Sequence, residues 1–240
     1  MSGRTVTPPH AVSDAYVGLL EAFRAAVEDA GMTVKLPSRA VSASFIASGS
    51  TTAVFARSLY LRNWPDRRMP RSQRLDLVVS ALETFQTLTW SLTKSTVYLN
   101  YLVETSDVAV QLVQSLHFDF TANGQDCHPF FHVQLNDEVI AEQYIRDLRS
   151  ESFDVELRPP KDRQISSVAM SIPTPDMTLA SVLYCLVAHH LPGVFPAFAK
   201  RVHTIQNRLP LVGFDALRNS MMKSCHFKSS HWFAHMPSLA

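Results

Sequence analysis

The sequence predicts an α+β fold, with an antiparallel sheet of about five to six strands, helices at the N-terminus and a cluster of helices at the C-terminus. Apolar residues recur at helical spacing over residues 11–30, strand-like segments follow one another through 95–172, and helical spacing returns after Pro173. Consecutive strands joined by short turns pair antiparallel, which distinguishes this pattern from an alternating βαβ fold. We expect a single domain over residues 1–240, its helical part at 173–240 packed on the sheet.

The first half of the chain begins with a helix at 11–30, for which Ser13 is a candidate N-cap and Gly31 a candidate stop. The alternation of VSASFIAS predicts a strand at 41–48, whereas 51–62 fits either a strand or a helix. A second helix is expected next, with Ser72 as its cap. Its core stripe would consist of Leu75, Val78, Val79, Leu82, Phe85 and Leu92.

The second half reads as strands and then helices. Residues 95–104 are rich in β-branched and aromatic side chains, and further strands are expected at 108–120, 129–139, 152–157 and 165–172. Asn123-Gly124 indicates a hairpin between the strands at 108–120 and 129–139, although its loop is longer than two residues. Helices are predicted at 178–191, 195–209 and 214–225, the first capped by Asp176 or Thr178.

Composition excludes several classes of protein. A net charge of +1 argues against a uniformly basic nucleic-acid binder. The seven glycines are too far apart to form either familiar glycine-rich phosphate loop. Three scattered cysteines favour a reducing compartment, and no apolar run reaches the ~20 residues of a spanning helix. We therefore expect a cytoplasmic protein that does not enter a membrane.

One stretch could carry chemistry, namely LHFDFTANGQDCHPFFHVQ at 116–134. Strand side chains alternate between faces, so His117 and Asp119 share one face and His132 and Gln134 share a face of the next strand. If the phenylalanine-rich faces of the two strands coincide, these four residues coincide on the other face. His128 would lie at the turn beside them.

Three interpretations of this polar face stay open. It could be the solvated side of a half-buried sheet, or a binding surface that includes Gln134. It could also be a site in which His117, Asp119 and His132 are catalytic, or in which these three and His128 hold a divalent metal. No cofactor is predicted, and the metal is the less favoured alternative because the spacing matches no established metal motif.

A second candidate region is the arginine segment at 57–74, which has six arginines against one aspartate and no lysine. Arginine suits phosphate and carboxylate recognition, and an aromatic ring beside it could stack on bases. The alternative is a solvated loop. The candidate binding residues are Arg62, Trp64, Arg67, Arg68, Arg71 and Arg74.

Three motifs together resemble a family of uncharacterised bacterial proteins. They are HFDF at 117–120, HPFFHVQ at 128–134 and IPTPDMTLASVL at 172–183. The resemblance implies a bacterial origin and a role near toxin–antitoxin or phage-defence systems, and it brings no catalytic residues with it. The members pair an FDF…HPxxH hairpin with this proline-flanked helix start, often with a histidine where this chain has Gln134.

The sequence leads to two hypotheses of function. In the first, the chain is a non-catalytic interaction protein, such as a subunit or antitoxin-like component, that binds another protein subunit and, through the arginine segment, nucleic acid. In the second, it is a metal-dependent or general acid–base hydrolase of phosphodiesters that uses His117, Asp119, His128 and His132.

Overall fold

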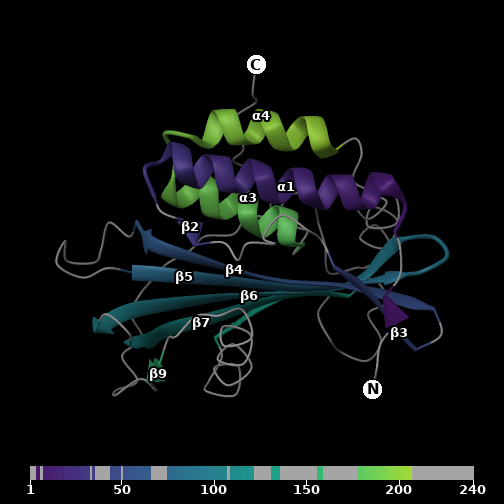
Figure 1. The fold of residues 1–240 in the computed structure, drawn as a ribbon, viewed down its shortest axis with the longest axis horizontal. Coiled ribbons are helices and arrows are strands. Elements are labelled where there is room, and N and C mark those ends of the chain that lie inside the picture. The colour runs from purple at the N-terminus through teal and green to yellow at the C-terminus, as the bar shows by residue number, and fades with distance from the viewer. Residues whose placement is uncertain are drawn as a thin grey trace, which may run out of the picture.

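The structure is a computed structural model that describes residues 4–5, 8–32, 34–35, 44–49, 51–65, 75–106, 109–121, 131–135, 156–158 and 178–206. In these ranges the chain forms a twisted sheet, and three helices lie along one face of it (Figure 1). This confirms the predicted α+β class.

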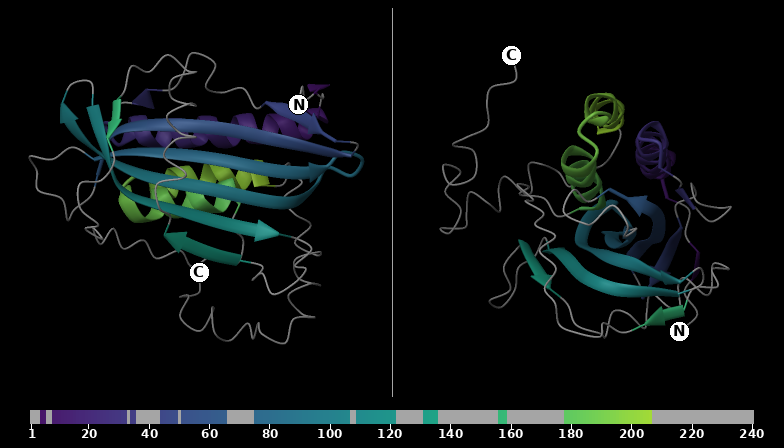
Figure 2. Two further views of the ribbon diagram at one scale, coloured as in Figure 1. Left: turned by 90° about the horizontal axis from the view of Figure 1, so that it is seen from below. Right: turned by 90° about the vertical axis from the view of Figure 1, so that its left-hand side faces the viewer.

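The sheet is antiparallel except for one pair. Its order within the described residues is β1-β3-β4-β5-β6-β7-β8, with β2 paired to β4 and β9 paired in parallel to β7 (Figure 2). The strands are β1 (Arg4–Thr5), β2 (Val34–Lys35), β3 (Phe45–Ser48), β4 (Thr52–Trp64), β5 (Leu75–Gln86), β6 (Ser91–Ser106), β7 (Ala109–Thr121), β8 (Phe131–Leu135) and β9 (Glu156–Arg158). The six strands from β3 to β8 account for the expected sheet.

Alternation along the long strands gives the sheet two distinct faces. The helix face packs on the helices in one apolar core, and we call the opposite side the far face. The helix face includes Phe55, Leu59, Leu61, Leu77, Val79, Phe85, Val97, Leu99, Tyr101, Leu116 and Phe118. The far face includes Tyr60, Asp76, Val78, Ser80, Asn100, Ser115 and His117, which are buried as well.

The N-terminal helix α1 (His10–Asp29) lies within one residue of the expected range, but it begins before the predicted cap. Pro9 holds the N-cap position in an extended conformation, and its carbonyl accepts the amides of Val12 and Ser13 at 2.9 and 3.2 Å. Ser13 is therefore inside the first turn and the predicted cap there is wrong. The predicted stop is confirmed, because Gly31 adopts a φ of 74° and its amide bonds the carbonyl of Glu28.

Two further helices, α3 (Leu179–His190) and α4 (Phe195–Gln206), complete the helix layer. The Thr178 hydroxyl accepts the Ser181 amide at 3.3 Å, so Thr178 is the N-cap. α4 packs against α1, where Phe23 and Phe198 meet edge to face. None of the helices in the described part of the chain is long and apolar enough to cross a bilayer.

The helix expected after Ser72 is wrong, because Leu75–Gln86 form strand β5 between β4 and β6. The cause is that both faces of this strand are buried at its start, so Leu75, Asp76, Leu77 and Val78 are all inaccessible. An apolar run buried on two sides loses the period of two and imitates a helical stripe. The ambiguous segment before it is also a strand, β4.

The other predicted strands and helices differ mainly in their bounds. The strands expected at 41–48, 95–104, 108–120, 129–139 and 152–157 correspond to β3, β6, β7, β8 and β9. The sheet therefore begins well before residue 95. The helices expected at 178–191 and 195–209 correspond to α3 and α4, whereas the segments at 165–172 and 214–225 are outside the described residues.

Candidate functional site on the far face of the sheet

The central hairpin brings the apolar faces of its two strands together, which is the condition that the sequence pattern set; the structure supplies the register. β7 and β8 pair antiparallel so that Phe118 is opposite Val133. The same register sets His117 opposite Gln134 and Asp119 opposite His132. Four polar positions thus meet on the far face as expected. The side chains at 132 and 134, and all of His128, lie outside what the structure describes.

His117 and Asp119 form a contact on this face. The His117 Nε2 atom is 3.2 Å from the Asp119 Oδ2 atom, with side chains 11% and 22% exposed. The ring of Tyr98 lies 5.8 Å from the imidazole, centre to centre. Burial raises the pKa of the Tyr98 hydroxyl, and the Asp119 carboxylate raises it further. A carboxylate that orients an imidazole is the geometry of a general acid–base pair.

Around His117 the described residues of the far face are buried, unlike the solvated polar face that is one of the three interpretations. His117 is 9% exposed, and its neighbours Thr96, Asn100 and Ser115 are 5%, 3% and 4% exposed. Asn100 and Ser115 are direct cross-strand partners. Within the described part of the chain, the amide atoms of Asn100 and the hydroxyl of Ser115 have no hydrogen-bond partner. Buried polar groups without partners are uncommon and costly.

The described residues contain no group of three or more histidine, cysteine, aspartate or glutamate side chains arranged to hold a metal ion. His117 and Asp119 provide two of the four predicted ligands. The full set stays a prediction, since it also needs His128 and the side chain of His132.

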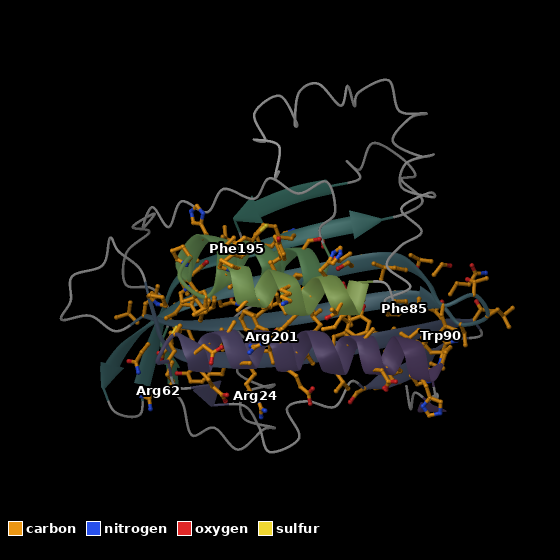
Figure 3. All side chains as sticks on the ribbon, turned by 90° about the horizontal axis from the view of Figure 1, so that it is seen from above. Arg24, Arg62, Phe85, Trp90, Phe195 and Arg201 are labelled. Carbon is orange, nitrogen blue, oxygen red and sulfur yellow. The ribbon has the colours of Figure 1, made fainter. Side chains whose placement is uncertain are left out.

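The arginine segment is described only at its start. Trp64 is 2% exposed and its ring packs 5.3 Å from that of His190, so it belongs to the core and the prediction that it stacks on a base is wrong. Arg62 is partly exposed, and lies at the opposite end of the sheet from Phe85 and Trp90 (Figure 3). Arg67, Arg68, Arg71 and Arg74 are outside the described residues.

Sequence reasoning missed a buried carboxylate near Arg62. Asp76 is 1% exposed, and it accepts the Tyr60 hydroxyl at 2.5 Å and the Asn63 amide at 3.0 Å. Asn63 has a φ of 58°, and the β4–β5 register shifts between Leu61 and Trp64. Asp76 therefore stabilises an irregular strand end and has a structural role. An acidic residue inside an apolar run was the available signal.

An exposed apolar patch on the far face was also missed. Ile46 and Leu82 are 44% and 45% exposed. Ile46 is opposite Val54, which is opposite Thr84, two residues from Leu82 on the same face of β5. We call Ile46, Val54 and Leu82 the far-face patch. Leu88, 83% exposed, lies in the β5–β6 turn beyond the same end of the strand. The available signal for this patch was Leu82, an apolar residue between Ala81 and Glu83. Its helical spacing places Leu82 in the core stripe of an expected helix that does not form.

Comparisons with protein-family models, with curated proteins and with solved structures found no match to this chain.

Proposed function

We propose that this chain is a non-catalytic interaction protein that binds another protein subunit through the far-face patch. The observation that carries the proposal is the exposure of Ile46 and Leu82 on neighbouring strands of one sheet face. Adjacent exposed apolar side chains with a polar surround are typical of protein–protein contact sites. Here the surround includes the exposed side chains of Ser48, Gln86 and Lys94.

The composition of the patch favours a protein over a nucleic acid. Phosphate contacts from lysine and arginine supply most of the affinity for nucleic acids. Lys94 is the one cationic side chain that the structure places beside the patch among its described residues, and Arg62 is at the other end of the sheet (Figure 3). Binding of nucleic acid by the arginine segment, and a partner from a toxin–antitoxin or phage-defence complex, stay predictions from the sequence.

Site-specific photo-crosslinking tests the proposal. A benzophenone amino acid replaces Leu82 in the patch or, as the control, Ala197 on the exposed side of α4. Irradiation in cells of the source organism is expected to give one defined protein adduct from position 82 and none from position 197. Adding Ile46→Glu should reduce the adduct about tenfold, because the buried charge would cost at least 1.4 kcal/mol of binding, as a rough estimate. Equal adducts from both positions, or an adduct that Ile46→Glu leaves intact, would contradict the proposal.

The hydrolase alternative is supported by the contact between His117 and Asp119. In that case the purified protein should cleave bis(p-nitrophenyl) phosphate, His117→Gln should abolish the cleavage, and elemental analysis should find a divalent metal that His132→Ala removes. A protein that does not cleave this substrate, or whose activity and metal content both substitutions leave unchanged, would end this alternative.

A further inference from the structure

A fully buried carboxylate connects the sheet to two of the helices. Glu83 is on the helix face of β5 and is 1% exposed. Its Oε1 atom accepts the Ser95 hydroxyl of β6 at 2.9 Å and the Leu179 amide of α3 at 2.8 Å. Its Oε2 atom accepts the Tyr16 hydroxyl of α1. One side chain therefore gathers donors from the next strand and from two helices that are distant in sequence.

The groups that face Glu83 include no cation among the described residues. β4 contributes Phe55, the cross-strand partner of Glu83, and β6 contributes Ser95. α1 contributes the hydroxyl of Tyr16, which is titratable, and α3 contributes the backbone amide of Leu179. A carboxylate buried without a cation favours its neutral form. Burial raises the pKa of Glu83, and hydrogen bonds from Tyr16, Leu179 and Ser95 oppose that rise.

The bond to Leu179 reaches the first residue of α3, where helix amides lack partners within the helix. Thr178 accepts the Ser181 amide, and Glu83 accepts that of Leu179, so the two acceptors share the first turn. The acceptor from the sheet thus satisfies an amide of the first turn that Thr178 does not. If the first turn of α3 moves away, water reaches the carboxyl group and the cost of its burial disappears.

We propose that Glu83 is a proton-controlled latch, which holds the first turn of α3 on the sheet most firmly when it carries a proton and loosens as the proton leaves. The direction follows from linkage. The closed state binds the proton more tightly than the open state, in which the carboxyl is hydrated. Raising the pH above about 4.5, the ordinary value, therefore shifts the equilibrium toward the open state until the closed form is itself ionised.

Amide hydrogen exchange of the whole chain tests the latch between pH 5 and 8. The protection factor of the Leu179 amide, corrected for the intrinsic exchange rate, should fall by up to tenfold per pH unit over part of this range. The Leu191 amide, which bonds the Val187 carbonyl at the other end of α3, is the control and should not change in parallel. Glu83→Gln keeps the acceptor for Leu179 but does not titrate, so its protection factor should be independent of pH.

Tyr16→Phe gives a second, independent variant. It removes one donor that favours the ionised form, so the fall in protection should extend to higher pH than in the unmodified protein. A slope that persists in Glu83→Gln, or no slope in the unmodified protein, would overturn the proposal. If Glu83→Gln does not fold, the proposal is overturned when the pH dependence of the Leu179 protection factor in Tyr16→Phe equals that of the unmodified protein.

Discussion

At the scale of single residues, we expect substitutions of two buried serines to have opposite effects on the free energy of unfolding. The Ser115 hydroxyl has no hydrogen-bond partner in the described part of the chain, whereas the Ser95 hydroxyl donates to Glu83 at 2.9 Å. Ser115→Ala should leave the free energy of unfolding unchanged or raise it, and Ser95→Ala should lower it by about 1–3 kcal/mol. Urea denaturation of both variants measures this. A large loss in Ser115→Ala would mean that its hydroxyl has a partner in the folded protein.

Cys185 should react slowly with alkylating reagents. Burial in α3 raises the pKa of its thiol to about 11, so little reactive thiolate exists near pH 8. Alkylation by iodoacetamide, followed by mass spectrometry with Cys127 and Cys225 replaced by serine, should be much slower in the folded protein than in urea. The rate should continue to rise above pH 9. Equal rates in the folded and unfolded states would contradict the burial of this thiol.

At the scale of elements, the spacing of α1 and α4 depends on Gly18. A methyl group at this position would approach the Ile205 Cδ1 atom to 3.2 Å, which the flexible end of that side chain can relieve by a small movement. Gly18→Ala should therefore change stability by less than about 1 kcal/mol, since the gain in helix propensity offsets the contact. Gly18→Leu should destabilise by about 1–3 kcal/mol through overpacking. Thermal unfolding of both variants tests this. Equal melting points for Gly18→Ala and Gly18→Leu would contradict it.

The elements differ in how well their sequences revealed them. The helical stripe of α1 was clear, because the helix has one buried face and one more exposed face. The strand pattern of β6 was clear for another reason, since residues 95–104 are rich in β-branched and aromatic side chains. β5 was not clear, since Asp76, Val78 and Ser80 are buried opposite an equally buried helix face. Its neighbours in the sheet, not its own residues, decide that it is a strand. Local sequence carries no information about such a partner.

The candidate site shows the same division. The face that each residue of β7 and β8 occupies could be predicted, because strand side chains alternate and the apolar faces must coincide. The exact register could not, because a shift by two residues keeps the same faces together. That His117 is buried could not be predicted, as burial depends on what covers the face. The base-stacking role of Trp64 failed for a related reason: its partner His190 is more than a hundred residues away in sequence. The far-face patch was hidden by the incorrect period assigned to β5.

At the scale of the whole molecule, Glu83 should make global stability depend on pH. Its pKa is raised in the folded state, so its favourable contribution is complete below the unfolded value near 4.5 and is lost as the pH rises through the folded value. The free energy of unfolding should therefore fall with rising pH in the unmodified protein, relative to Glu83→Gln. Urea titrations at several pH values measure the difference. If the free energy of unfolding depends on pH in the same way in the two proteins, Glu83 makes no such contribution to stability.

The hydrogen bonds from α1 and α3 to Glu83 in β5 have a consequence for synthesis. Glu83 bonds a hydroxyl 67 residues before it and an amide 96 residues after it. While the ribosome is still translating the residues before Leu179, the finished strands expose their phenylalanines and leucines. We expect chains truncated before α3 to aggregate or to be bound by chaperones, because α3 and α4 shield part of the helix face and are made after the strands that they cover.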